Sequence, residues 1–210
     1  MEPKLTHLCY CLLLFLPLLS QSAIAKPSPT SSSSPNPSNS INFIVSSCRT
    51  TRYTTLCIKC LAPFAGKIRH NENRLAQTAL AVTLFRVQST TVYVAKLTRV
   101  SGIKRREYLA VKDCIENLGD GLEMLAQSMR ELKQVGRSRR GQDEFLWRLS
   151  NVETWVSAAL TDETTCLDGF DGKAMDGEVK SAIRRRVVHV ARVTSNALAL
   201  VNRFAARHKP

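Results

Sequence analysis

Histidine is scarce in this chain, and the histidines that occur are far apart. Of four in 210 residues, three follow the first apolar segment, namely His70, His189 and His208. No Ser/His/Asp or Cys/His arrangement and no set of residues at metal-ligand spacing accompanies them. The sequence therefore argues against an enzyme, and we expect no metal ion and no other cofactor.

Long apolar runs are also lacking beyond the first residues. The segment "LCYCLLLFLPLL", residues 8–19, is too short to be a typical membrane span. Lys4 precedes it and "AIA", residues 23–25, follows, as is typical of a secretory signal peptide. We expect residues 1–25 to be removed and the rest to be secreted with no membrane anchor. The chain has no Asn-x-Ser/Thr sequon with a permitted middle residue, so N-glycosylation is not expected.

Acidic residues are few relative to basic ones. Lys and Arg number 30 against 17 Asp and Glu, for a net charge of +13. Such a charge favours an acidic partner, for example an anionic polysaccharide, a negatively charged protein cleft, a membrane surface or nucleic acid. Secretion argues against nucleic acid and leaves an anionic polysaccharide among the expected partners of the basic surface.

Five cysteines follow the expected cleavage site, namely Cys48, Cys57, Cys60, Cys114 and Cys166. In an oxidising compartment, four of them would form two disulfides and one would stay free. Cys57 and Cys60 also form a Cys-x-x-Cys pair. No strand–helix alternation surrounds this pair and no second Cys or His pair has zinc spacing, which argues against a redox or zinc site.

The rest of the chain predicts an all-α protein. Residues 26–40 are rich in Pro and Ser and read as a linker before an expected domain at 41–207. Residues 41–70 predict a helical hairpin. Apolar residues at helical spacing then predict four long helices over about 72–101, 104–135, 142–168 and 175–207. Long amphipathic helices joined by short loops favour an up-down-up-down four-helix bundle over 72–207.

The cysteine positions suggest how two of these helices are tied together. Cys114 lies early in the second long helix and Cys166 late in the third, so antiparallel packing would bring them together. A bridge between them would close a long loop, which corresponds to about 4 kcal/mol of chain entropy. In the hairpin, Cys48 would pair with Cys57, with Cys60 as the competing partner. We also expect the hairpin to pack loosely on the bundle or to reach away from it.

Several segments together resemble the plant invertase and pectin methylesterase inhibitor family. The hairpin "IVSSCRTTRYTTLCIKCLAPFA" is similar to the family's N-terminal signature. Similar segments surround the third and fourth cysteines, "AVKDCIENLGDGLEML" and "VETWVSAALTDETTCLDGF", and the last helix contains "VTSNALALVNRF". The resemblance spans about 41–207. It implies a four-helix bundle with an N-terminal helical hairpin and two disulfides, Cys48–Cys57 and Cys114–Cys166.

The resemblance also implies a function in the cell wall. One branch of the family inhibits pectin methylesterase, which removes methyl groups from pectin, and the other inhibits acid invertase. Invertase inhibitors are associated with a Pro-Lys-Phe motif, which this chain lacks. We therefore expect a secreted, apoplastic inhibitor that docks reversibly and stoichiometrically over the substrate cleft of pectin methylesterase. The alternatives are an acid invertase inhibitor and a basic wall-binding or antimicrobial helical protein.

Acidic residues near Cys114 and Cys166 are the candidate docking residues. On the second long helix, Glu116, Asp120 and Glu123 share one face, at i, i+4 and i+7. On the third, Asp162, Thr165 and Asp168 lie close to Cys166, and a Cys114–Cys166 bridge would let the two sets converge. The resemblance implies that the enzyme interface includes Glu116, Asp120, Glu123, Thr165 and Asp168.

A simpler interpretation applies to the same residues. Glu116 can pair with Lys112, and Asp168 can belong to the turn that ends its helix. A charged helix face is commonly only solvated. The sequence leaves both interpretations open.

Overall fold

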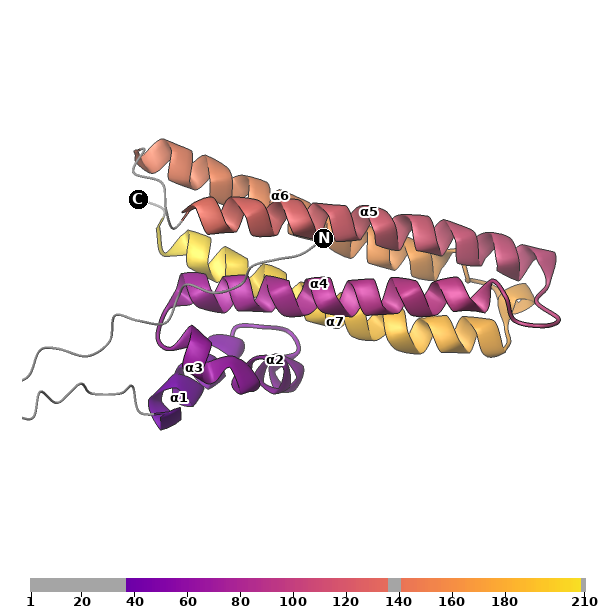
Figure 1. Ribbon diagram of the computed structural model, residues 1–210, viewed down its shortest axis with the longest axis horizontal. Coiled ribbons are helices and arrows are strands. Elements are labelled where there is room, and N and C mark those ends of the chain that lie inside the picture. The colour runs from indigo at the N-terminus through magenta and orange to yellow at the C-terminus, as the bar shows by residue number, and fades with distance from the viewer. Residues whose placement is uncertain (1–36, 136–140, 209–210) are drawn as a thin grey trace, which may run out of the picture. The chain divides into compact units, whose positions relative to one another are not determined.

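The computed structural model describes residues 37–135 and 141–208, and every regular element within them is helical (Figure 1). The N-terminal part contains α1 (Pro37–Cys48), α2 (Thr54–Leu61), the 3₁₀ turn η1 (Ala62–Phe64) and α3 (Ala65–Ile68). The remainder contains α4 (Glu72–Leu97), α5 (Arg105–Val135), α6 (Gln142–Asp168), the 3₁₀ turn η2 (Lys173–Met175) and α7 (Glu178–Ala206). The predicted all-α bundle with its hairpin is confirmed.

The four long helices run alternately up and down. In Figure 1, α4 and α6 point one way and α5 and α7 the other, and successive helices lie side by side. Helix α4 also packs on α7, which closes the ring of four. The α5–α6 side of the bundle therefore lies opposite the α4–α7 side.

The ends of the helices follow ordinary local chemistry. Asn71 caps α4, its side-chain oxygen accepting from the Arg74 N–H at 2.8 Å. Gly102 lies between α4 and α5 with a φ of 77°, a left-handed conformation that glycine adopts at little cost. The Glu107 carboxylate then accepts from the Lys104 N–H at 2.9 Å at the start of α5. These signals explain why the predicted helices agree closely with the observed ones.

The core follows the predicted apolar spacing. Each of the long helices contributes fully buried side chains to one continuous cluster, including Leu80, Leu118, Leu125, Val156 and Ile183. Burial of a Leu or Ile side chain contributes about 1.5–3 kcal/mol. The apolar stripe thus determines which side of each helix faces its neighbours.

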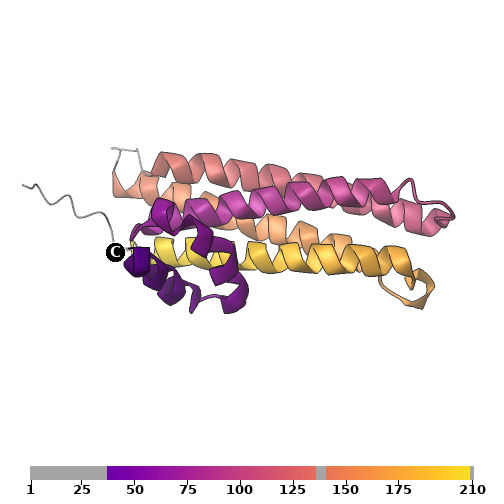
Figure 2. The same ribbon diagram turned by 60° about the horizontal axis from the view of Figure 1, so that its bottom comes forward.

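The hairpin packs firmly on α4 and α7, so the prediction of loose packing is wrong (Figure 2). Ile44 and Ile68 are fully buried in the same core cluster as the bundle. The backbone of Tyr53 is also held by Asn196 of α7: the Tyr53 N–H donates to Oδ1 at 3.1 Å, and Nδ2 donates to the Tyr53 carbonyl at 3.0 Å. The prediction of loose packing did not take account of this pair of hydrogen bonds, called the polar clamp below. Tyr53 and Asn196 are far apart in sequence, so no local pattern indicates that they meet.

Both predicted disulfides are present. Cys48 is bonded to Cys57 within the hairpin, and Cys114 is bonded to Cys166 between α5 and α6. Cys60 is free and half-buried. The alternative Cys48–Cys60 pairing is therefore not the one observed.

The expected signal peptide, residues 1–25, lies outside the described residues, as does most of the expected linker at 26–40. The described part begins with α1 at Pro37, four residues before the expected domain start. Within the described residues no helix combines the length and apolar character that a membrane span requires.

Candidate protein-docking surface

Helices α5 and α6 approach one another closely at the candidate site. The Cα atoms of Cys114 and Cys166 are 4.3 Å apart across the disulfide. Two turns further along α5, a Cβ added to Gly121 would lie 3.4 Å from the Ala159 carbonyl oxygen and 3.6 Å from Cβ of Asp162. The bridge and this glycine contact bring the predicted residues of both helices to one side of the bundle.

Three carboxylates follow the outer face of α5. Glu116, Asp120 and Glu123, called the acidic stripe below, are all exposed. Within the described part of the chain none of them forms an ion pair, and the Glu116–Lys112 pair considered above is not formed. Glu123 only accepts a hydrogen bond from Gln127, at 3.3 Å. The stripe is therefore free to meet positive groups of another molecule.

Asp162 extends this acidic surface onto α6. Its side chain is half-buried, and its pKa is raised first by burial and then by the negative charge of Asp120. A negative charge held close to a carboxyl group disfavours its ionisation. The effect of Asp120 on the pKa of Asp162 shows that Asp162 lies near the acidic stripe. The family resemblance did not place Asp162 among the interface residues.

Thr165 and Asp168 lie further along α6, and both are exposed. The Thr165 hydroxyl donates to the Thr161 carbonyl at 3.0 Å, a local bond within the helix. Asp168 is the last residue of α6, and its backbone carbonyl accepts from the Asp171 N–H at 3.0 Å in the following turn. Its carboxylate remains on the surface, beyond the disulfide and on the same helix as Asp162.

Beneath this surface lies a buried carboxyl group that the sequence analysis did not identify. Glu163 has no exposed surface, and burial raises its pKa to about 8. Thr194 Oγ1 lies 2.7 Å from Glu163 Oε1 and 3.2 Å from the Val190 carbonyl oxygen. The Thr194 hydroxyl donates to Glu163 Oε1, which lowers the pKa of Glu163 but offsets only part of the effect of burial. With a pKa of about 8, Glu163 is mostly protonated below that pH, and its hydrogen bond from Thr194 joins α6 to α7.

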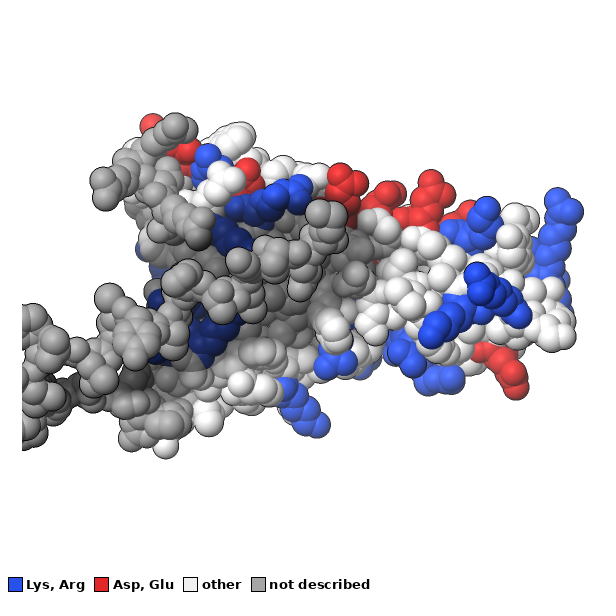
Figure 3. All heavy atoms as spheres, in the orientation of Figure 1, with Lys and Arg blue, Asp and Glu red and all other residues white. Residues whose placement is uncertain are grey.

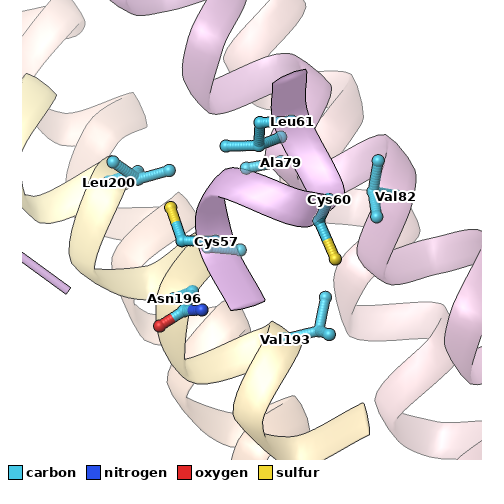
Figure 4. Close-up of a pocket in the computed structure, with 9 residues that line it drawn as sticks. Cys57, Cys60, Leu61, Ala79, Val82, Val193, Asn196 and Leu200 are labelled. Carbon is cyan, nitrogen blue, oxygen red and sulfur yellow. The ribbon is translucent and has the colours of Figure 1, made fainter. Parts of the chain in front are cut away.

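A small cavity lies elsewhere, between α2, α4 and α7 (Figure 4). Its volume is about 10 Å³, room for at most one water molecule. The Cys60 thiol points into it between Val82 and Val193, and burial raises the pKa of that thiol. No group of His, Cys, Asp and Glu in the described residues could hold a metal ion. The cavity is too small to be a ligand site, so the exposed α5–α6 surface is the stronger candidate.

Comparison with known proteins gives consistent matches. Residues 42–200 match the family described as plant invertase/pectin methylesterase inhibitor. Pectinesterase inhibitor 9 of Arabidopsis thaliana is 59% identical over 180 residues, which cover 85% of this chain and 88% of that protein. The 21 kDa protein of Daucus carota is 51% identical over 167 residues, 80% of this chain and 86% of the relative.

The fold has been seen before in a solved structure. The crystal structure of a mutant form of a pectin methylesterase inhibitor from Arabidopsis superposes with a TM-score of 0.59. The match covers 74% of this chain and 92% of that one, at 21% identity. At this identity the likeness concerns the fold alone.

Proposed function

This chain belongs to the plant invertase/pectin methylesterase inhibitor family, and from this membership we propose that it inhibits pectin methylesterase by docking over the enzyme's substrate cleft. The family comprises inhibitor proteins, so the chain acts on an enzyme and is not one itself. The proposal further assigns a reversible, stoichiometric complex through which the inhibitor controls pectin de-esterification.

The acidic stripe is the observation that supports this docking surface. Glu116, Asp120 and Glu123 are exposed and form no ion pair with the described residues of a protein whose net charge is +13. Carboxylates left unpaired in so basic a molecule are free to pair with basic groups of a partner, which gives specificity and faster association. Asp162 adds a fourth carboxyl group to the same surface.

Thr165 and Asp168 complete the proposed docking surface at the end of α6. Both are exposed on the helix that the disulfide ties to α5. In this proposal Thr165 contributes a hydroxyl and Asp168 a carboxylate at the rim of the interface. Rim groups contribute more to orientation and association rate than to affinity.

Titration of the purified mature chain against a panel of pectin methylesterases and acid invertases tests the function. We expect loss of methylesterase activity with an end point at one inhibitor per enzyme, and unchanged invertase activity. Inhibition of invertase alone would favour the other branch of the family. Inhibition of neither, with retained binding to pectin, would favour a wall-binding protein without an enzyme target.

The proposal places the protein in the apoplast. The support is the signal-like sequence at residues 1–25, together with two disulfides of the kind that persist in an oxidising compartment. Association of the basic surface with anionic pectin in the cell wall is the remaining part of the proposal.

A further inference from the structure

The charges of this protein are divided between opposite sides of the bundle. No Asp or Glu occurs between Glu72 and Glu107, after Glu178, or in the hairpin. The hairpin, α4 and α7 therefore hold carboxylates only at the first residues of α4 and α7, while the other acidic residues after Glu72 lie on α5, α6 and adjoining loops. Figure 3 shows acidic side chains along the edge over α5, and mainly Lys and Arg over α4 and α7.

Aromatic rings hold several arginines of the basic side in place. Arg186 of α7 lies over the Tyr93 ring of α4, with its guanidinium carbon 3.7 Å from the ring centroid. Arg192 and Arg52 lie 5.3 and 5.7 Å from the ring centroid of Tyr53. A stacked guanidinium keeps its N–H groups available in a planar fork while losing side-chain freedom in advance. Binding an anion therefore costs these arginines less conformational entropy.

Arg86 of α4 and His189 of α7 lie between the Arg186–Tyr93 contact and the arginines around Tyr53. The pKa of His189 is lowered by burial and by the positive charges of Arg86 and Arg192, which places both arginines near it. Positions 186, 189 and 192 lie about 9 Å apart end to end along α7. Arg52, Arg86, Arg186 and Arg192 thus form a continuous arginine band along the α4–α7 side as far as the hairpin.

None of these four arginines forms an ion pair with a carboxylate of the described residues. By contrast, Arg203 and Arg207 both pair with Glu72, and Arg148 pairs with Glu131 and Glu144. The arginine band is therefore a row of uncompensated guanidinium groups on one face, and three of them, Arg52, Arg186 and Arg192, lie against aromatic rings. Its charge and linear form fit a chain molecule that bears a carboxylate at each repeat.

We propose that the arginine band binds an acidic polysaccharide built of uronate units, with guanidinium forks pairing with sugar carboxylates. The choice of de-esterified pectin among such polymers rests on the proposed function, because removal of methyl groups by the target enzyme leaves carboxylates. Since the band and the acidic stripe lie on opposite sides, one molecule can hold the enzyme on one face and the enzyme's product on the other. The inhibitor would then be concentrated where de-esterification has already occurred.

The test compares binding of the mature chain to polygalacturonate and to fully methylesterified pectin at low and at high salt. The band variant Arg186→Gln, Arg192→Gln removes two stacked guanidinium groups. The control variant Arg105→Gln, Arg106→Gln removes two exposed arginines from α5, so both variants have the same net charge. Circular dichroism establishes that each variant is folded.

We expect the parent to bind polygalacturonate much more tightly than methylesterified pectin, with affinity that falls as salt rises. The band variant should lose at least about tenfold in affinity, and the control variant clearly less. Equal losses in both variants would show that only net charge matters and would overturn the band as a site. Absence of a preference for the de-esterified polymer would also overturn it.

Two further measurements distinguish a polysaccharide site from a membrane-binding site and from the proposed enzyme-docking surface. Vesicles of phosphatidylcholine with phosphatidylserine test a membrane partner, and band-dependent binding to vesicles but not to polygalacturonate would refute a polysaccharide site. Calorimetric titration of each variant with pectin methylesterase in the absence of pectin tests the docking surface alone. Normal enzyme binding with unaltered polysaccharide binding by the band variant refutes only the band. If the parent binds polygalacturonate but does not bind pectin methylesterase, only the proposed inhibition is refuted.

Discussion

Glu163 is the residue whose protonation most directly affects stability. Its carboxyl group is fully buried, and its Oε2 atom has no hydrogen-bond partner in the described residues. An ionised carboxylate in this position would lack both water and a counter-charge, which is costly. The neutral form, joined to Thr194, is the one that the bundle stabilises.

We expect the protein to become less stable as pH rises from acidic to alkaline values. The pKa of Glu163 rises from an ordinary value of 4.5 to about 8, so the folded chain holds this proton more tightly than the unfolded chain. The resulting stabilisation is complete below pH 4.5 and is lost as pH rises through about 8. Between these limits the free energy of unfolding should fall by about 1.4 kcal/mol per pH unit from this group.

Urea unfolding of the parent and of Glu163→Gln across this pH range provides the measurement. The amide keeps the size of the neutral acid but does not ionise, so the variant should show a flatter dependence of stability on pH. The exposed change Glu123→Gln is the matched control and should leave the parent's dependence nearly intact. Parallel curves for the parent and Glu163→Gln would contradict the assignment.

At the scale of single elements, the outer face of α5 carries the proposed docking function. Glu116 and Asp120 are exposed and make no ion pairs within the described residues, so reversing both to Lys should scarcely disturb the fold. Exposed changes typically alter stability by no more than about 0.5 kcal/mol. If the stripe faces basic groups of the enzyme, the two new lysines would repel those groups. Such repulsion across an interface costs several kcal/mol of binding free energy.

We therefore expect Glu116→Lys, Asp120→Lys to keep its helical spectrum and lose at least about tenfold in affinity for pectin methylesterase. The control is Asp143→Lys, Glu178→Lys, two exposed residues in the first turns of α6 and α7. The control has the same net charge and should inhibit normally, although loss of the helix-dipole interaction costs it about 0.3–1 kcal/mol per site. Unchanged inhibition by the stripe variant would mean that the face is only solvated.

The hairpin is the second element whose attachment can be tested. Asn196 is buried and exchanges two hydrogen bonds with the backbone of Tyr53. Replacing it with Ala leaves the Tyr53 backbone groups without these partners, and each unsatisfied buried group costs about 1–3 kcal/mol. Amide hydrogen exchange in α1 and α2 should become faster, with smaller changes in α5 and α6. Ser195→Ala, at the preceding position on α7, is the control, and equal exchange in both variants would refute the clamp.

At the scale of the whole molecule, the Cys114–Cys166 bridge connects stability to function. It closes a loop with a sequence separation of 52 residues, for which the chain-entropy relation gives about 4 kcal/mol. It also holds α5 and α6 together beside the acidic stripe and Asp162. We expect Cys114→Ser, Cys166→Ser to melt at a lower temperature and to inhibit more weakly at a temperature where it remains folded.

Calorimetric melting followed by an inhibition assay below the transition makes this measurement. The hairpin variant Cys48→Ser, Cys57→Ser is the comparison, because it also lacks a disulfide but leaves the α5–α6 side intact. It should be destabilised and yet retain more of its inhibition than the bundle variant. Full inhibition by the folded Cys114→Ser, Cys166→Ser protein would separate the bridge from the docking surface.

The sequence by itself determined the bundle, the approximate helix limits and the face that each helix buries. These depend on local information: the helical spacing of apolar residues, the cap at Asn71 and the glycine at 102. Exposure of Glu116, Asp120 and Glu123 on one face was likewise predictable, since i, i+4 and i+7 share a side of a helix. Their role in docking remains a prediction, as do the roles of Thr165 and Asp168.

Only the tertiary structure decided which residues from distant segments meet. Asp162 and Glu163 are adjacent in sequence, yet one lies near Asp120 and the other is buried against Thr194, because neighbouring residues of a helix point in different directions. The hairpin's attachment depends on Tyr53 and Asn196, which are 143 positions apart. The sequence shows that acidic residues are concentrated in the segments of α5 and α6. It does not show on which side of the folded bundle these helices lie. The packing of α4 on α7, opposite α5 and α6, turns that distribution into two faces of opposite charge.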